Sequence, residues 1–345
     1  MPSSSPIDPH DLSDQTVFVT GGTGFVGSHL VEELLRRDAG EVRCLVRSDP
    51  KWLADLDVTS VSGTLSDAEA LWEALDGVDV VYHVAGVTRA PDWETFERVN
   101  VRGTLSLMGA IRHAAPNLDR VVVTSSLAAV GACDAAVATE ETPLHPVSRY
   151  GRSKAEMEKA LRDPHQMTES YWDSLPITVV RPPAVYGPRD RDILDFFQAV
   201  KRHICPVVGG GGPSLSLVHA RDLVRGMVDL AETSSAERET YFLSSNEPYA
   251  WADVKAAATE ALDTWAVTIP VPGPLVGVVG AVSEFWGSLT GTYPPLNREK
   301  AREIRYACTA CSHEKAGRDA GFKPQISLQE GVRETIRWYK EQGWL

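Results

Sequence analysis

Two side chains that could exchange a proton with a substrate stand four residues apart, at Tyr150 and Lys154. On a helix, positions four apart share one face, so the phenol and the ammonium group would lie side by side. A free tyrosine has a pKa of about 10, and a neighbouring positive charge stabilises the phenolate and lowers that pKa. We therefore expect Tyr150 to act as a general acid and base, with Lys154 lowering its pKa.

A hydroxyl that could orient a substrate carbonyl follows the apolar run at residues 121–124. This run, Val-Val-Val-Thr, is typical of a buried strand, and Ser125 and Ser126 come directly after it. In an open parallel sheet, ligands bind at the carboxyl ends of the strands. The position of Ser126 therefore favours a hydrogen bond to a substrate carbonyl.

Three glycines near the N-terminus, Gly21, Gly24 and Gly27, indicate a nucleotide site. They lie between an apolar run at residues 16–19, predicted to be a strand, and a helical pattern made by Leu30, Val31, Leu34 and Leu35. The first glycine permits a tight turn, the second lets backbone N–H groups approach a pyrophosphate at the helix N-terminus, and the third lets helix and strand pack closely. Strand, glycine turn and helix together predict a dinucleotide site.

Residues 20–27 resemble the Thr-Gly-Gly-x-Gly-Phe-[Val/Ile]-Gly pattern of the extended branch of the short-chain dehydrogenase/reductase superfamily. The resemblance implies that Thr23, Phe25 and Val26 join the three glycines in contact with an NAD(P) cofactor. The segment at residues 181–188 is similar to the Arg-Pro…Tyr-Gly-Pro segment of that branch, which leads into a substrate domain.

The same resemblance assigns the catalytic residues. It implies that Ser126, Tyr150 and Lys154 are the catalytic serine, tyrosine and lysine, with Ser125 as the less favoured serine. Asn100 matches the supporting asparagine of the family, which could hold a proton-relaying water. The alternative for Asn100 is a polar residue inside a helix that makes only local hydrogen bonds.

The end of the second predicted strand, at residues 42–46, bears on the choice between NAD and NADP. An acidic residue about 20 positions past the glycines would bind the ribose 2′-OH of NAD, whereas an arginine favours the 2′-phosphate of NADP. Arg47 stands there, and Asp49 lies beyond the strand end. NADP is therefore the predicted cofactor, with NAD the less favoured one. We also expect the cofactor to contact the small-residue turn at Val84, Ala85 and Gly86, and further Thr64, Leu65, Pro182 and Val185.

The alternation of strand and helix patterns predicts an α/β fold, a doubly wound parallel (Rossmann) sheet with a smaller, mostly C-terminal α/β substrate domain. We expect residues 1–13 to be a disordered arm and residues 14–186 to form the NAD(P)-binding domain, with 216–245 returning to it. Residues 187–215 and 246–345 would form the substrate domain. The apolar stretch at 271–286 is either a buried helix of that domain or a cover over a lipophilic substrate.

The net charge and the cysteine content limit which partners, compartment and metal sites we expect for this chain. The 345 residues carry a formal net charge of −13, which argues against nucleic acid or an anionic membrane surface as a partner. Five cysteines suit a reducing compartment, so we expect a cytoplasmic protein. Cys308 and Cys311 have metal-ligand spacing, but no further pair accompanies them, and no metal site is predicted. The expected partners are a small-molecule substrate and a second copy of the chain in a homodimer, with no membrane span.

These features predict an NADP-dependent oxidoreductase acting on a carbonyl or secondary alcohol. The chain most resembles the 3β-hydroxysteroid dehydrogenase and dihydroflavonol reductase side of the extended branch, which implies a lipophilic substrate. The alternative is a nucleotide-sugar epimerase that uses bound NAD. Sugar dehydration is disfavoured because Leu127 and Ala128 stand where dehydratases of the superfamily carry an acidic pair. A non-catalytic NADP sensor is disfavoured because Tyr150 and Lys154 are both present.

Overall fold

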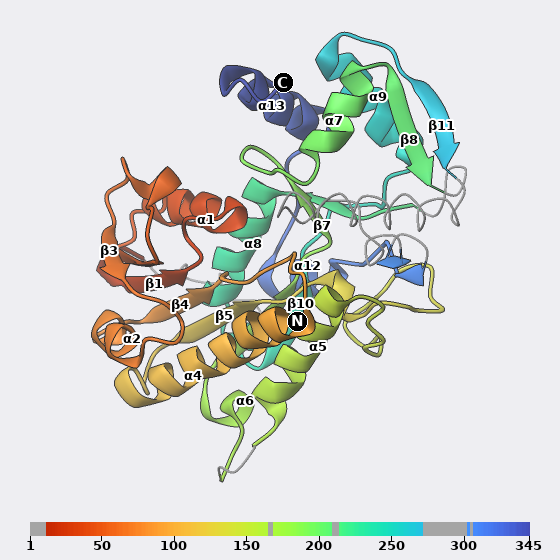
Figure 1. Cartoon of the computed structure of the whole chain (residues 1–345). Coiled ribbons are helices and arrows are strands. Elements are labelled where there is room, and N and C mark those ends of the chain that lie inside the picture. The colour runs from red at the N-terminus through yellow and green to blue at the C-terminus, as the bar shows by residue number, and fades with distance from the viewer. Residues whose placement is uncertain (1–11, 165–167, 209–213, 272–301, 304–305) are drawn as a thin grey trace, which may run out of the picture.

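The computed structural model describes residues 12–164, 168–208, 214–271, 302–303 and 306–345 (Figure 1). At its centre lies a seven-stranded sheet in the order β10–β6–β5–β4–β1–β2–β3, in which all neighbouring strands run parallel. The strands are β1 (Thr16–Thr20), β2 (Glu41–Val46), β3 (Thr59–Ser62), β4 (Val80–His83), β5 (Arg120–Thr124), β6 (Ile177–Arg181) and β10 (Glu239–Phe242). The predicted Rossmann-like fold class is confirmed.

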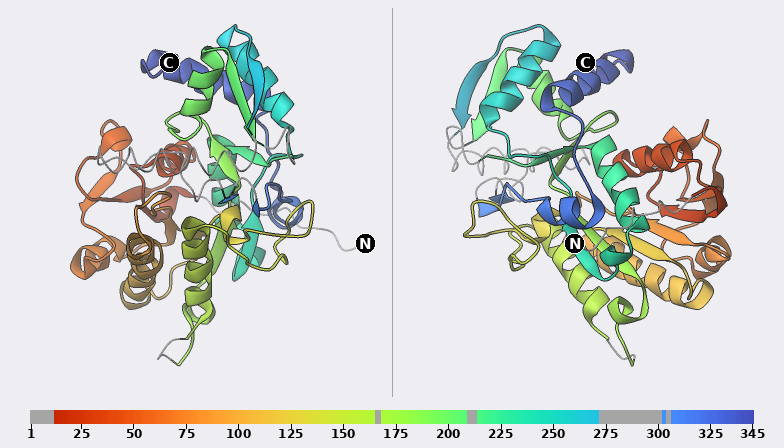
Figure 2. Two further views of the ribbon diagram at one scale, coloured as in Figure 1. Left: turned by 45° about the vertical axis from the view of Figure 1, so that its right-hand side comes forward. Right: turned by 180° about the vertical axis from the view of Figure 1, so that it is seen from behind.

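Helices cover both faces of this sheet (Figure 2). On β1, Val17 and Val19 belong to one buried core and Phe18 belongs to the other, because successive side chains point to opposite faces of a strand. The first core is completed by α1 (Phe25–Arg36) and α8 (Ala220–Glu232). The second is completed by α2 (Ala68–Leu75), α4 (Gly103–Ala114) and α5 (Arg149–Arg162). Burial on both faces explains why the strand sequences are almost continuously apolar.

The strand order reverses between β1 and β4. From β1 the chain adds β2 and β3 on one side, and β4, β5 and β6 continue on the other side. In such sheets the ligand crevice lies outside the carboxyl ends of the strands at this reversal. The glycine turn follows β1 and residues 84–86 follow β4, so both predicted cofactor segments lie at the reversal.

A smaller region lies beyond the carboxyl edge of the sheet (Figure 1). It contains the parallel pair β8 (Ile204–Val208) and β11 (Val267–Val271), with α7 (Leu194–Lys201), α9 (Trp251–Leu262) and α13 (Leu328–Glu341). A second parallel pair joins β7 (Ala184–Tyr186) to β9 (Leu217–His219). Within 216–245, α8 packs against α1, and β10 joins the large sheet beside β6. The domain boundaries drawn from the sequence stay a prediction.

The shorter helical segments are η1 (Leu12–Asp14), η2 (Lys51–Leu53), α3 (Trp93–Phe96), the π-helix η3 (Glu97–Arg102), η4 (Leu127–Ala129), α6 (Tyr171–Ser174), η5 (Ser234–Ala236) and α12 (Glu314–Ala320). The expected disordered arm was drawn too long, because Leu12 is buried in the core that α1 and α8 complete. Burial of this apolar side chain favours an ordered position for Leu12 itself.

Most of the apolar stretch at 271–286 cannot be assessed, since only Val271, the last residue of β11, belongs to the described residues. Across the described ranges, the structure has no helix that is both long enough and apolar enough to cross a bilayer.

Candidate active site

The glycine turn after β1 is held by close backbone contacts. Gly21 has a φ of +80°, and a Cβ added to it would lie 2.6 Å from the Ala85 backbone nitrogen after β4. A Cβ added to Gly27 would lie 2.1 Å from the carbonyl oxygen of Gly21. Side chains at these two positions would push the turn away from both the neighbouring strand and α1. The glycines therefore let three backbone segments approach one another.

Helix α1 begins directly after this turn. Gly24 is its N-cap residue, and no side chain among the described residues caps this end. The first backbone N–H groups of a helix lack intrahelical partners and, together with the helix dipole, attract anions. A glycine turn, an uncapped helix N-terminus and a strand-order reversal therefore fit the pyrophosphate of a dinucleotide.

The other predicted cofactor residues lie close to the same edge of the sheet. Thr23 and Val26 belong to the glycine turn and the first turn of α1, and the ring of Phe25 packs edge-on against His29 with centroids 5.7 Å apart. Residues 64–65 follow β3, and residues 84–86 follow β4. Pro182 follows β6, and its carbonyl oxygen accepts a hydrogen bond from the backbone N–H of Leu127. Val185 lies in β7, paired with Val218.

Arg47 follows β2 and is exposed. It has no hydrogen-bond or ion-pair partner among the residues that the structure describes. The nearby carboxylate of Asp49 accepts a hydrogen bond from the backbone N–H of Lys51 at 2.9 Å, within the turn that leads into η2. The guanidinium group is thus available to a ligand, while this carboxylate is engaged in its own turn.

Tyr150 and Lys154 lie on α5, as the four-residue spacing predicted. Ser148 caps the helix by accepting the Gly151 backbone N–H at 3.0 Å, and its hydroxyl donates to Glu303 Oε1 at 2.5 Å. Lys154 Nζ donates to the carbonyl oxygen of Thr124, at the end of β5, at 2.7 Å. Tyr150 shares a side-chain hydrogen bond with Ser126. Serine, tyrosine and lysine are therefore brought to one place.

Burial shifts the pKa values of two members of this group. Burial raises the pKa of Tyr150 to about 12, the hydrogen bond with Ser126 lowers it, and the charges of Glu303 and Asp192 raise it further. Burial lowers the pKa of Lys154 to about 8, against the opposing charge of Glu158. Lys154, whose ammonium donates to the Thr124 carbonyl, is not among the groups that shift the pKa of Tyr150 here, and its role in lowering that pKa stays a prediction.

Asn100 lies in the π-helix η3 and joins two elements of the site. Its Oδ1 accepts the Val87 backbone N–H at 2.8 Å, and its Nδ2 donates to the Val87 carbonyl oxygen at 2.9 Å and to Ser153 Oγ at 2.8 Å. Both amide hydrogens are thus engaged in holding the loop after β4 to α5. These contacts reach beyond its own helix, so the alternative of purely local hydrogen bonds is wrong, while the supporting role of Asn100 stays a prediction.

Sequence reasoning missed two acidic residues beside this site. Glu303 bonds to the N-cap of α5, and no motif marks it in the sequence. Glu158 lies one helical turn past Lys154, and its carboxylate accepts hydrogen bonds from Ser125 and Arg181. The signal for Glu158 was its spacing, because positions 150, 154 and 158 lie on one face of a helix.

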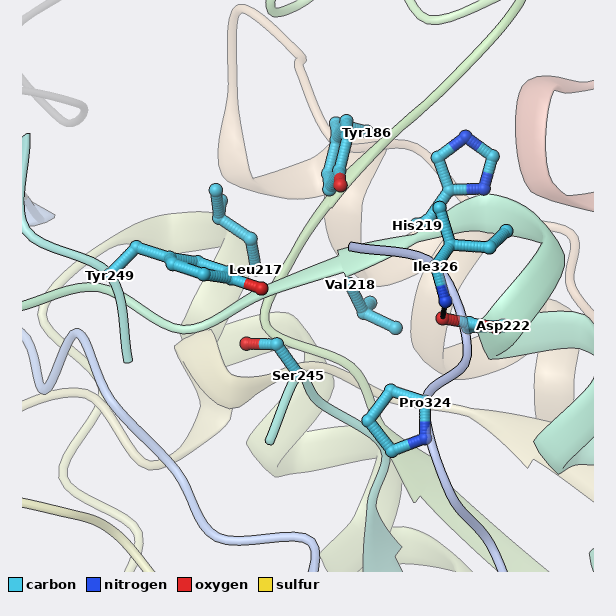
Figure 3. A pocket seen from close by; sticks show the side chains of 9 residues that line it. All are labelled: Tyr186, Leu217, Val218, His219, Asp222, Ser245, Tyr249, Pro324 and Ile326. Atoms are coloured by element: carbon cyan, nitrogen blue, oxygen red, sulfur yellow. Dashed lines mark hydrogen bonds between the residues drawn. The ribbon is translucent and has the colours of Figure 1, made fainter. Parts of the chain in front are cut away.

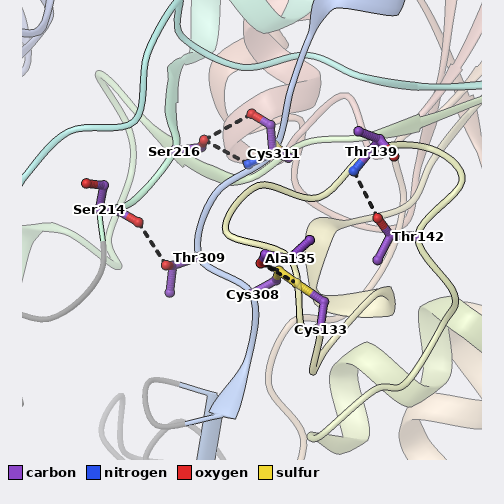
Figure 4. Close-up of a disulfide and its surroundings, with 9 residues drawn as sticks. All are labelled: Cys133, Ala135, Thr139, Thr142, Ser214, Ser216, Cys308, Thr309 and Cys311. Carbon is purple, nitrogen blue, oxygen red and sulfur yellow. Dashed lines mark hydrogen bonds between the residues drawn. A yellow bond between two sulfur atoms is a disulfide. The ribbon is translucent and has the colours of Figure 1, made fainter.

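A disulfide joins Cys133 to Cys308 beyond the candidate catalytic serine (Figure 4). Next to it, the Cys308 backbone N–H donates to the carbonyl oxygen of Gly131 at 2.7 Å. Cys311, the other half of the Cys-x-x-Cys motif, is a buried free thiol. The cytoplasmic location expected from the low cysteine count stays a prediction.

A small hollow lies where β7 and β9 meet the segment before α13 (Figure 3). None of the predicted catalytic residues lines it; its walls include Tyr186, His219, Tyr249 and Ile326. His219 accepts the Arg221 backbone N–H at the start of α8, and the carboxylate of Asp222 accepts backbone N–H groups before α13. The structure thus gives both residues helix-start and packing contacts.

Comparisons with known proteins agree with this geometry. The model of the NAD dependent epimerase/dehydratase family matches residues 17–260. The chain is 32% identical to a ceramide reductase of Caulobacter vibrioides, over 95% of this chain and 96% of that protein. It is 26% identical to a 3 beta-hydroxysteroid dehydrogenase/Delta 5-->4-isomerase of Mycobacterium tuberculosis, over 94% and 90% of the two chains.

Solved structures agree as well. The crystal structure of DesIV, a dTDP-glucose 4,6-dehydratase from Streptomyces venezuelae with NAD and TYD bound, superposes with a TM-score of 0.75 at 26% identity. The alignment covers 96% of this chain and 98% of that one. The likeness therefore extends over almost the whole of both proteins.

Proposed function

The chain belongs to the NAD dependent epimerase/dehydratase family, and from this premise we propose that it is an NADP-dependent oxidoreductase acting on a lipophilic carbonyl or secondary alcohol. Membership makes it an NAD(P)-dependent enzyme of the short-chain dehydrogenase/reductase type. The observation that carries the proposal is the grouping of Ser126, Tyr150 and Lys154 beside the glycine turn.

Each residue of the group has a role in the proposed reaction. A bound nicotinamide would supply or accept the hydride, which is chemistry that no side chain can perform. Ser126 holds the substrate oxygen, and Tyr150 exchanges a proton with that oxygen. Lys154, anchored at Thr124, adds positive charge to the site and binds the ribose of the nicotinamide. Asn100 fixes the loop after β4 to α5 and so keeps these groups in register.

The proposed cofactor contacts follow the sheet edge. Gly21, Gly24 and Gly27 would admit the pyrophosphate at the start of α1. Arg47 would bind the 2′-phosphate, and its free guanidinium supports NADP over NAD. The remaining contacts that we propose are those of Thr23, Phe25, Val26, Thr64, Leu65, Val84, Ala85, Gly86, Pro182 and Val185.

A lipophilic substrate is supported by the relatives. The names of the Caulobacter and Mycobacterium proteins refer to a ceramide and to a 3β-hydroxysteroid, both of which are large apolar alcohols or their ketones. These two relatives align over nearly the whole chain, including the region after residue 187 that is the proposed substrate domain. The homodimer expected from the sequence stays a prediction that the solution mass would measure.

A nucleotide-sugar epimerase that keeps NAD bound is the second candidate. The family match and the DesIV structure with bound NAD support it. Epimerases of the superfamily generally hold NAD through an acid at the end of the second strand, and the exposed Arg47 stands at this point instead. The two candidates differ in how tightly the cofactor is held.

The experiment compares both candidates on one preparation. Absorbance of the purified protein reports retained nicotinamide, after which ketone, long-chain keto-lipid, steroid and nucleotide-sugar panels are tested with NADPH and NADH. We expect exchangeable cofactor and NADPH-dependent ketone reduction. Retained NAD with sugar turnover would replace the proposal with the epimerase.

The Tyr150→Phe variant tests the proton transfer. Loss of a general acid lowers turnover by about a hundredfold or more, while the Kd of NADPH stays near that of the wild type. Tyr171→Phe, which removes the hydroxyl of a buried tyrosine on α6, is the matched control and keeps full turnover. Near-normal turnover in Tyr150→Phe would remove this residue from the mechanism.

A further inference from the structure

A buried carboxylate lies behind the candidate catalytic residues. Glu158 is on α5, one turn past Lys154, and only 1% of it is exposed. Its Oε1 accepts hydrogen bonds from Ser125 Oγ at 2.6 Å and from Arg181 Nε at 2.9 Å, and its Oε2 accepts one from Arg181 Nη2 at 2.6 Å. The bidentate arginine pair is the strong form of such an interaction and fixes the plane of the carboxylate.

The partners of Glu158 stand at the ends of two neighbouring strands. Ser125 directly precedes Ser126 at the end of β5, and Arg181 is the last residue of β6. The backbone N–H of Ser125 donates to the carbonyl oxygen of Val180 at 2.7 Å. One carboxylate on the helix of Tyr150 thus fixes the strand ends that lead to the serine.

The charges around this carboxylate come from several elements. Arg181 faces it from β6, and Arg162 lies 3.7 Å away, one helical turn further along α5. Lys154, on the same helix, feels its negative charge, which raises the pKa of the lysine against the larger effect of burial. His83, the last residue of β4, is hydrogen-bonded to Thr20 and Thr104, and burial together with the charge of Lys154 lowers its pKa to about 3.

We propose that Glu158, held by Arg181, is a positioning residue that aligns Ser126 with Tyr150 and places a negative charge one helical turn from Lys154. The expected effect of Glu158 on turnover rests on the proposed function, whereas its expected effect on Lys154 does not. Breaking a buried ion pair also destabilises a protein, so lower stability by itself would not support the proposal. If the proposal holds, removing the Glu158 carboxylate misplaces Ser126 and makes Lys154 lose its proton at a lower pH.

Glu158→Gln keeps the shape of the side chain and removes the charge. We expect kcat to fall about tenfold or more at pH 7, because small errors in the position of reacting groups are costly. The alkaline limb of kcat moves to lower pH, since the lysine loses its negative neighbour. Glu156→Gln is the matched control, because Glu156 lies on the same helix and pairs with Arg152, which is more than half exposed.

A measurement that needs no turnover separates this inference from the proposed function. NMR titration of protein with 13Cε-labelled lysine, assigned with Lys154→Met, reports the ionisation midpoint of Lys154. We expect this midpoint to fall by about half a unit or more in Glu158→Gln and to stay unchanged in Glu156→Gln. A shifted midpoint in a protein that reduces no carbonyl would refute the proposed function and retain the role of Glu158 at Lys154.

Arg181→Lys covers the case in which Glu158→Gln does not fold. It keeps the positive charge and gives up the bidentate geometry, so we expect kcat to fall while the Lys154 midpoint stays near that of the wild type. Wild-type kcat and an unchanged Lys154 midpoint in the folded variants, with only a lower Tm, would overturn the proposal. Glu158 would then be a structural residue alone.

Discussion

The Arg47→Asp substitution tests how the protein chooses its cofactor. The arginine follows β2, is exposed and has no partner among the described residues, so replacing it breaks no hydrogen bond or ion pair with them. The nearest acid in sequence, Asp49, already accepts the Lys51 backbone N–H. The substitution therefore places a free carboxylate at a strand end that otherwise has none.

The expected loss of NADP affinity follows from the exposure of Arg47. Two unit charges 4 Å apart interact by about 1 kcal/mol in water and about 4 kcal/mol at an effective dielectric constant of 20. Because Arg47 is exposed, we take the lower part of this range, close to the roughly 1.5–3 kcal/mol of a charge-assisted hydrogen bond. Since about 1.4 kcal/mol corresponds to tenfold in Kd, NADP should bind ten- to a hundredfold more weakly. NAD binding should improve, because the new carboxylate can accept a hydrogen bond from the ribose 2′-OH.

The assay is isothermal titration of both cofactors at two salt concentrations. Loss of NADP affinity should shrink at high salt, because exposed charges are screened. Arg36→Asp is the matched control: it makes the same charge change on the outer face of α1, where Arg36 is exposed and pairs with Glu33. If Arg47→Asp binds NADP and NAD with the same Kd values as the wild type, the assignment of Arg47 to the 2′-phosphate is refuted. An equal loss of NADP affinity in Arg36→Asp would show that the effect comes from the change in net charge alone.

Two further predictions concern the frame of the site. Gly27→Ala should destabilise the fold by roughly 1–3 kcal/mol, seen as a lower Tm, and weaken cofactor binding, because its Cβ would lie 2.1 Å from the carbonyl oxygen of Gly21. Gly22→Ala, whose nearest atoms would lie at 3.4 Å, should be almost neutral. Equal effects of the two substitutions would contradict the close approach. His83 and His219 are buried, and burial lowers the pKa of each to about 3, so the unfolded chain binds protons first on acidification and Tm should fall between about pH 6.5 and 3. A Tm that stays level over this range, measured by calorimetry, would show that neither ring resists protonation.

Local features made much of the fold predictable. The apolar runs at residues 16–19, 42–46 and 121–124 became β1, β2 and β5, because a strand buried on both faces is mostly apolar. The exposed strand β3 carries little of this signal and was missed. The edge strand β10 was placed only within the segment expected to return to the nucleotide domain. β3 was missed because it is mostly exposed, whereas β10 is buried but too short to give a clear hydrophobic pattern.

The sequence by itself determined the glycine turn and the helical pairing of Tyr150 with Lys154, because both depend on short spacings within one strand, turn or helix. Only the tertiary structure decided what surrounds them. It brought Arg181 onto Glu158, Glu303 onto Ser148 and Cys308 onto Cys133, contacts between residues 23, 155 and 175 positions apart. It also turned Lys154 toward a backbone carbonyl and set its pKa through burial. Such contacts and the desolvation of a side chain depend on how distant segments pack, and no local spacing encodes that.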